Sequence, residues 1–272
     1  MDRNWKVIIP RVDGDEQLYN STFMHGINNL KFKVVLYNCG DDPNNSNTIR
    51  YKYQRGIAFA KNNQLEDEDI VILCHNDVNF IDAHFREKVE RIFQETDIAL
   101  LGVIGTSSLN DTGCWWDGAK NILRGHIIQG AREKVAGDGF HLVKGQIGFF
   151  DDIVAVDGLC MITLGKYLKQ SGIDIDIQTY SGNHFYDLDL CMCYLSKGFK
   201  VGIADILVYH KSEGESNQQE EWTKDRDSFI NKWKSKGVEF PVTVESMKSW
   251  REKNNIVTPD LNKQPQIIEI EI

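Results

Sequence analysis

Residues that could bind a metal ion first occur together at positions 75–77, where one asparagine separates His75 from Asp77. They follow Cys74 and the apolar run 70–73, which is typical of a buried strand in a parallel sheet. Ligands of open α/β sheets bind beyond the carboxyl ends of the strands, so we expect both side chains at the rim of a crevice. There, a carboxylate and an imidazole can hold a divalent cation that neutralises a diphosphate. The alternative is a loop that only caps the strand.

A second group of acidic residues lies in the segment HFYDLDLCMCYL, residues 184–195. If Asp187 opens a helix, its carboxylate lies near the positive end of the helix dipole. Asp189 is two positions further and points to a different face, so one acid can cap the helix while the other faces the crevice. Asp157 lies in an otherwise apolar segment and needs a partner or a function there. His210 follows another apolar run, where a histidine is more often an ordinary surface or core residue.

A long irregular stretch, residues 106–148, contains Trp115 and Trp116 in the segment GCWWDGAKN. Loops of this length inside a compact domain are usually functional or mobile. The two indole rings could stack on a sugar ring or a base, or they could pin the loop to the core.

Segments that could position these residues alternate between strand-like and helix-like patterns. Apolar runs predict strands, and apolar residues at helical spacing predict helices. The predicted strands are 5–10, 32–38, 70–73, 98–104 and 199–209, and the predicted helices are 21–29, 53–64, 85–95 and 220–236. The alternation predicts βαβ units and a mostly parallel sheet.

Composition limits the class of protein. The chain has 272 residues and a formal net charge of -9, which argues against nucleic-acid binding and against general attraction to anionic lipid. We find no apolar run long enough to span a bilayer and no signal-peptide pattern. The six cysteines show no metal-ligand spacing and are expected to be free thiols in a reducing compartment. We therefore predict a soluble, cytoplasmic protein.

Taken together, these segments resemble the GT-A-fold glycosyltransferases of family 2, in particular a bacterial subgroup with HxD in place of the usual DxD. The resemblance runs from about Trp5 to Gly214. It implies an α/β fold with a mostly parallel central sheet flanked by helices, in one large domain. We expect that domain over residues 1–217, with a nucleotide-binding half (1–105) and an acceptor and catalytic half (106–217). A helical extension would cover 218–257, and the tail 258–272 would suit an edge strand.

The resemblance also implies where the nucleotide sugar binds. In such enzymes the first strand and its loop, the end of the second strand and the opening of a later helix surround the nucleotide. His75 stands where an aspartate commonly contacts ribose or metal. With the loop residues added, the predicted donor-binding set is Pro10, Arg11, Asp13, Asn38, Asp41, Arg55, Asn62, His75, Asn76, Trp115 and Trp116.

The catalytic and metal-binding positions follow from the same resemblance. The catalytic base of the family maps onto Asp187, with Asp157 or Asp189 orienting the acceptor or the base. Asp77 and His210 map onto metal ligands, and mixed oxygen and imidazole ligation favours Mn²⁺ over Mg²⁺. The implied reaction moves a sugar from a UDP- or dTDP-sugar to a hydroxyl of a glycan or lipid-linked acceptor, with inversion. The acceptor would belong to a bacterial surface glycan.

Two other classes of function stay open at this point. A sugar nucleotidyltransferase would also use a metal at the edge of a sheet, but the first strand is not followed by a glycine-rich, lysine-bearing phosphate loop. A non-catalytic nucleotide-sugar or glycan-binding protein would keep the tryptophans and would not need Asp187. A weak peripheral association with a membrane and a homo-oligomer are both compatible with the sequence.

Overall fold

The structure is a computed structural model that describes residues 4–10, 34–39, 48–117, 121–130, 141–212 and 220–261, with the backbone alone for 34–39. The predicted helix 21–29 and the apolar end of the tail lie outside the described residues. The side chains of five cysteines are described, and all five are free thiols. Within the described part of the chain, no helix has the length and apolar character needed to cross a bilayer.

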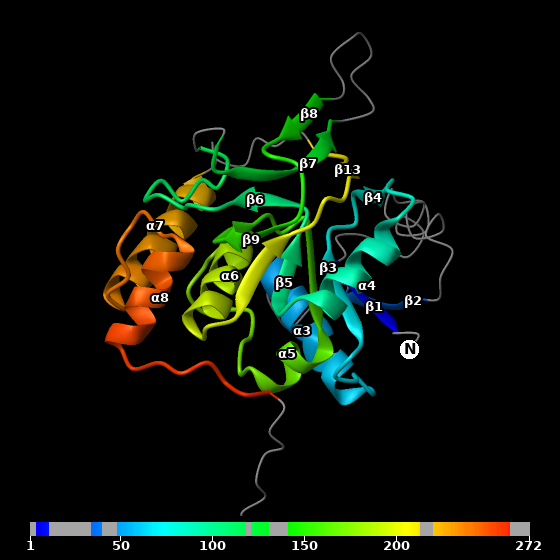
Figure 1. Cartoon of the computed structure of the whole chain (residues 1–272), viewed down its shortest axis with the longest axis horizontal. Coiled ribbons are helices and arrows are strands. Elements are labelled where there is room, and N and C mark those ends of the chain that lie inside the picture. Colours follow the sequence, from blue (N-terminus) through cyan, green and yellow to red (C-terminus); the bar gives the residue numbers. More distant parts are fainter. Residues whose placement is uncertain are drawn as a thin grey trace, which may run out of the picture.

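A seven-stranded sheet forms the centre of the described fold (Figure 1). Its strands, in spatial order, are β2 (Val34–Cys39), β1 (Trp5–Pro10), β3 (Ile70–Cys74), β11 (Cys160–Leu164), β5 (Ile98–Gly102), β12 (Lys200–Ile203) and β9 (Phe150–Ile153). The inner strands β3, β11 and β5 are buried at every position and almost entirely apolar, with Thr163 as the polar exception, because helices and other strands cover both faces of the sheet. The predicted α/β fold is confirmed.

The pairing within this sheet is mixed. β1 runs parallel to β2 and β3, and β5 runs parallel to β12, as the alternating pattern predicts. β11 is antiparallel to both β3 and β5, and β9 is antiparallel to β12. Five of the seven strands therefore run in the same direction, as expected for a mostly parallel sheet, and β11 and β9 run in the opposite direction.

Six helices flank the sheets in the described residues. They are α3 (Ile49–Asn62), α4 (Phe85–Glu95), α5 (Gly165–Gln170), α6 (Tyr186–Ser196), α7 (Glu220–Ser235) and α8 (Val244–Lys253). α4 has the predicted bounds and buries four apolar residues at helical spacing along one face. In Figure 1, α7 and α8, coloured orange, lie at one end of the molecule beside α6.

A smaller sheet lies across one edge of the central sheet. Its strands, in order, are β10 (Ala155–Val156), β6 (Ile104–Thr106), β7 (Leu123–Gln129), β13 (Val208–His210) and β4 (Val78–Phe80), and β8 (His141–Lys144) pairs with β7. β4 and β6 begin soon after β3 and β5 end, so this sheet lies at the carboxyl ends of those strands. The predicted strand 199–209 is two strands, β12 and β13, which belong to the two different sheets.

The reversed direction of β11 matters for the site. The chain leaves the small sheet at β10 and enters the central sheet at Cys160, which lies opposite Cys74 at the end of β3. The backbone N–H of His75 donates to the carbonyl of Leu159 at 3.0 Å. The residues just before β11 therefore lie beside the residues just after β3.

Candidate active site

One cavity of about 440 Å³ lies at this edge, between the two sheets and the start of α6. Chain segments that are far apart in the sequence line it together. Of the residues predicted from the sequence, it is lined by His75, Asp77, Trp115, Trp116, Asp157, Asp187 and His210.

A histidine–aspartate–histidine cluster lies on one side of the cavity. One potential ligand atom from each of His75, Asp77 and His210 lies within 4.8 Å of the other two. The Nε2 atom of His210 is 3.5 Å from Oδ1 of Asp77, and this oxygen is buried without a hydrogen-bond partner. A buried carboxylate oxygen without a donor is costly, and a bound cation would satisfy it. One carboxylate oxygen and two imidazole nitrogens form a donor set that divalent first-row metal ions accept, so these residues fit a divalent cation.

One turn and one strand pairing bring the three residues of this cluster together. Asp77 lies between β3 and β4, and β13 pairs antiparallel with β4 so that His210 faces Val78 across the ladder. The N–H of Lys211 donates to the carbonyl of Asp77 at 2.8 Å, which fixes the register. His210 was unremarkable as a single residue after an apolar run, and only this strand pairing explains its place.

The protonation of the cluster follows from burial and from the neighbouring charges. Burial lowers the pKa of His75, which favours the neutral imidazole that metals bind. Burial alone would raise the pKa of Asp77, but the nearby His210 outweighs it and lowers this pKa. Burial likewise opposes the charged form of His210, yet the neighbouring Asp77 raises the His210 pKa overall. The aspartate is therefore ionised in the site.

Tyr186 connects the cluster to α6. Its hydroxyl lies 2.7 Å from Nε2 of His75 and 3.4 Å from the carbonyl oxygen of Gly158. Burial raises the pKa of Tyr186 well above its usual value, so the hydroxyl stays neutral. A hydrogen bond to one ring nitrogen fixes the orientation and tautomer of a histidine. Tyr186 therefore sets how His75 faces the cavity.

Asp187 occupies the first turn of α6 and faces the loop before β11. One of its oxygens accepts from the N–H of Gly158 at 2.8 Å, and the other accepts from the N–H of Leu188 at 2.9 Å. Burial, and then the charge of Asp157, raise the pKa of Asp187 to about 7. A carboxylate with this pKa can accept a proton near neutral pH.

The start of α6 has an unusual backbone. Phe185, the residue before the helix, has φ of 62°, in the left-handed region that a bulky residue rarely adopts. Its ring is buried against Trp222 and Phe229 of α7, with centroids 5.2 and 5.5 Å away. Such conformations persist where the surrounding packing enforces them, and they cluster at functional sites. The tight entry directs Tyr186 and Asp187 into the cavity.

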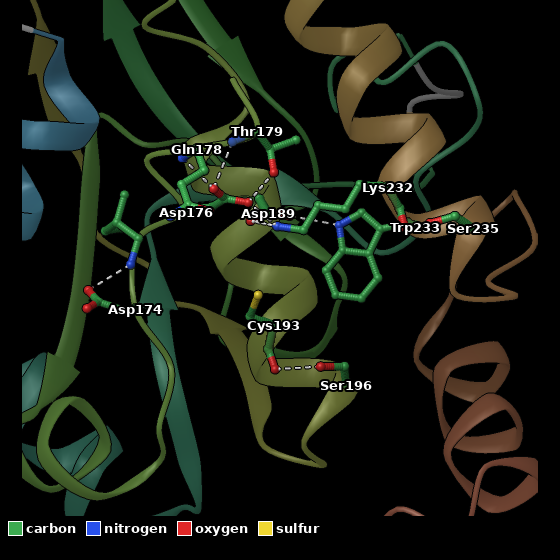
Figure 2. A network of polar contacts seen from close by, with 11 residues as sticks. Asp174, Asp176, Gln178, Thr179, Asp189, Cys193, Ser196, Lys232, Trp233 and Ser235 are labelled. Carbon is green, nitrogen blue, oxygen red and sulfur yellow. Dashed lines mark hydrogen bonds and ion pairs between the residues drawn. The ribbon is translucent and has the colours of Figure 1, made fainter. Parts of the chain in front are cut away.

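Asp189, which we expected beside Asp187 in the crevice, does not line the cavity. It is buried and contacts α7: Nζ of Lys232 donates to one oxygen at 2.7 Å and the indole N–H of Trp233 donates to the other at 2.9 Å. Lys232 also donates to Asp176 at 2.7 Å (Figure 2). We call Asp176, Asp189 and Lys232 the ionic cluster. Because its oxygens are used in this way, Asp189 joins helices, and Asp157 is the carboxylate that accompanies Asp187.

The remaining predicted donor residues lie elsewhere. Arg11, Asp13 and Asp41 fall outside the described residues, and only the backbone of Asn38 is described. Four others do not line the cavity, namely Pro10 at the end of β1, Arg55 and Asn62 on α3, and Asn76. Their role in nucleotide binding stays a prediction.

Several cavity residues were absent from the predicted set, among them Gly158, Tyr186 and Trp222. Gly158 has no room for a side chain, because a Cβ there would clash with the hydroxyl of Tyr186. Tyr186 itself precedes the predicted base by one residue, which was the only sequence signal for it. Trp222 lies at an apolar position of a predicted amphipathic helix, which is the usual pattern of core packing.

The chain resembles known proteins in its family and in its structure. A family described as "Glycosyltransferase like family" matches residues 45–236, more than half of the chain. No curated protein matches the sequence. The structure of GalNAc-T7 with UDP, GalNAc and Mn²⁺ is similar, with a TM-score of 0.50 and 10% identity over 94% of this chain. This chain covers 55% of that one.

A second solved structure has a lower similarity. It is the mannosyltransferase PcManGT from Pyrobaculum calidifontis in complex with GDP-Man and Mn²⁺. The TM-score is 0.45 and the identity 9%, over 79% of this chain and 59% of that one.

Proposed function

The chain belongs to the glycosyltransferase-like family that matches residues 45–236, and from this premise we propose a specific reaction for it. It moves a sugar from a nucleoside-diphosphate sugar to a hydroxyl group of an acceptor, with inversion at the anomeric carbon. The observation that carries the proposal is that the His75–Asp77–His210 cluster and Asp187 line one cavity.

The leaving group needs positive charge. Departure of the diphosphate leaves additional negative charge on its oxygens, and a divalent cation held by His75, Asp77 and His210 would stabilise that charge as a Lewis acid. The unpartnered Oδ1 of Asp77 and the neutral imidazole of His75 support these assignments. We propose Mn²⁺ as the ion, and GalNAc-T7 supports this choice because its similar structure holds UDP and Mn²⁺.

The attacking hydroxyl must lose its proton. We assign Asp187 as the general base, because its pKa of about 7 suits proton acceptance at neutral pH. The N–H groups of Gly158 and Leu188 hold its carboxylate in place. Asp157 strengthens the base by its negative charge and can orient the acceptor. For inversion, the hydroxyl oxygen attacks the anomeric carbon from the face opposite to the diphosphate.

The finer parts of the proposal rest on the resemblance to family 2 enzymes. These parts are a UDP- or dTDP-sugar donor, a glycan or lipid-linked acceptor from a bacterial surface glycan, and a reaction in the cytoplasm. The donor base would lie near β1 and β2, beside the predicted residues Pro10, Arg11, Asp13, Asn38, Asp41, Arg55, Asn62 and Asn76. The division into a domain over 1–217 and a helical extension over 218–257 is likewise a proposal.

Donor hydrolysis tests this function without knowledge of the acceptor. UDP-, GDP- and dTDP-sugars are incubated with the protein, with and without Mn²⁺, and the released nucleoside diphosphate is measured. We expect metal-dependent release from at least one donor, and a loss of about 100-fold or more in Asp77→Ala. Asp97→Ala is the matched control, because the Asp97 side chain is 71% exposed and forms an ion pair with the surface residue Lys200. Metal-independent release, or equal activity in both variants, would refute the proposal.

A further inference from the structure

Four aromatic side chains form a continuous surface in the cavity, which we call the aromatic wall: Trp115, Trp116, Phe185 and Trp222. The ring centroid of Trp116 lies 5.5 Å from that of Trp115 and 6.2 Å from that of Trp222. Trp222 in turn lies 5.2 Å from Phe185. Three of the rings are buried, whereas Trp116 is 37% exposed. The three buried rings therefore support one indole that is open to the cavity.

We propose that the acceptor is a carbohydrate whose pyranose ring stacks on Trp116, in a subsite that Trp222 of α7 completes. This inference rests on the proposed function and adds the chemical class of the acceptor. One face of a pyranose carries weakly positive C–H groups, which pack well on the negative face of an indole ring. The hydroxyl groups at the rim of the sugar need polar partners, and Gln129 and His184 line the same cavity.

The aromatic wall lies near the proposed general base, Asp187, and therefore near the place where the acceptor hydroxyl must bind. Phe185 precedes Asp187 by two residues, and its ring contacts Trp222 directly. The acceptor hydroxyl must reach the carboxylate of Asp187, so the ring that bears this hydroxyl lies near the start of α6. An aromatic platform in that place is positioned to hold the acceptor rather than the nucleotide.

The size and surroundings of the wall favour a sugar over a lipid chain. An acyl or polyprenyl chain needs an extended apolar surface, but Trp116 is the one strongly exposed apolar side chain among the described cavity residues. Carboxylates and imidazoles line the rest of the same cavity. A small apolar face with a polar rim matches a pyranose, which has the same division.

Hydrogen bonds hold α7, and with it Trp222, in a fixed position beside the cavity. Its Asp225 is buried and accepts from the N–H groups of Ser181 and Gly182 at 2.8 and 3.0 Å. Its Glu221 accepts from the N–H of Asn183 at 2.9 Å. Further along the helix, the ionic cluster and Trp233 fix α7 to α6 (Figure 2). The subsite is therefore preorganised, which lowers the entropy cost of binding.

The test compares transfer with hydrolysis in one reaction. Wild type, Trp116→Ala and Trp116→Phe are given the active donor, Mn²⁺ and a panel of methyl α- and β-pyranosides and short oligosaccharides. The ratio of glycoside product to hydrolysed donor is measured. We expect Trp116→Ala to lower this ratio about tenfold through a higher acceptor KM, and Trp116→Phe to retain most of it. Phe59→Ala is the control, because Phe59 is 56% exposed on α3 and does not line the cavity.

Three outcomes would overturn the inference. The first is donor hydrolysis by the wild type without transfer to any saccharide, together with transfer to a peptide or lipid hydroxyl. The second is an unchanged ratio in Trp116→Ala. The third is a donor Kd weakened in parallel with transfer, which would place Trp116 at the donor. Failure of the proposed function looks different, because the wild type would then hydrolyse no donor.

Discussion

Asp187 and Asp157 lie together at the point where α6 and β11 begin, and their closeness makes one of them a stronger base. Asp187→Asn keeps the shape of the side chain and removes the proton acceptor. We expect kcat to fall about 1,000-fold while the donor Kd changes little, because the base acts on the acceptor. Steady-state kinetics and calorimetry measure the two quantities. Asp227→Asn, at an exposed position of α7, should leave both unchanged.

The pH dependence of turnover should report the same carboxylate. Asp187 must be deprotonated to accept a proton, so kcat/KM should rise with pH and level off above about 7. Asp157→Asn removes one of the two causes of the raised pKa and should move this limb to lower pH. A limb that stays in place in Asp157→Asn would show that the charge of Asp157 does not act on the base.

The raised pKa of Asp187 also has a cost in stability. Because the folded-state pKa is above the unfolded value of 3.8, the folded protein binds the proton more tightly. The stability contribution is thus full below about pH 4 and is lost as pH rises through about 7. Asp187→Asn should therefore be more stable than wild type at pH 8, by about 1–2 kcal/mol in urea unfolding. No gain at pH 8 relative to pH 4 would contradict this.

At the scale of elements, the ionic cluster holds α7 against α6. Lys232 lies between two carboxylates, and its removal leaves Asp189 buried without its cation. Lys232→Met should destabilise the protein by about 3 kcal/mol, whereas Lys234→Met, at an exposed position of the same helix, should change stability little. Chemical unfolding of both variants measures the difference.

Acid should reduce the difference in unfolding free energy between the wild type and Lys232→Met. Burial alone would raise the pKa of Asp176, but hydrogen bonds from Lys232 and Thr179 outweigh it and depress the pKa. Such a group stabilises the fold above the unfolded pKa of 3.8, and its contribution is lost as pH falls through the depressed value. The free energies of unfolding of wild type and Lys232→Met should therefore approach each other below about pH 4. A constant difference would mean that the effect of Lys232 is packing alone.

Elements with a strong periodic pattern could be predicted from the sequence, and their pairing could not. The run 70–73 and the helix 85–95 appear where their apolar spacing places them, because burial alone determines that pattern. The direction of β11 depends on which neighbours it pairs with, and no local pattern encodes that. α8 lies within the expected helical extension 218–257, but it was not predicted as a separate helix, because only Met247 of its residues is buried. Its one clear signal was the capping box formed by Thr243 and Ser246.

The same limit applies to the site. Asp77, Asp187 and His210 were predicted as one group from the resemblance, and the structure brings them to one cavity. Asp189 looks identical to Asp187 in sequence, since both are acids in the first turn of α6. Only the position of Lys232 and Trp233, about 43 residues away, separates their surroundings. Trp222 reached the cavity wall for the same reason, through long-range packing.

At the scale of the whole molecule, the two sheets meet at a charged edge that should become more stable when it is filled. Ligands that bind only the folded state raise stability by mass action. With UDP at about 100 times its Kd and Mn²⁺ present, we expect the Tm to rise by about 5 °C. UDP without Mn²⁺, and both ligands with Asp77→Ala, should give little shift. GDP and dTDP serve as comparisons for the base, and equal shifts with and without Mn²⁺ would contradict a shared site.

The attachment of α7 through the ionic cluster restricts how this enzyme can be recombined with its relatives. A chimera that exchanges only residues 220–235 would replace Trp222 of the proposed acceptor subsite, and it would leave Asp176 and Asp189 without their cation unless the imported helix carries a lysine at position 232. A hybrid without that lysine should misfold before any change of sugar preference could be observed. Residues 174–196 and 220–235 therefore form one structural unit, and we expect an exchange of acceptor choice to succeed only when both segments are exchanged together.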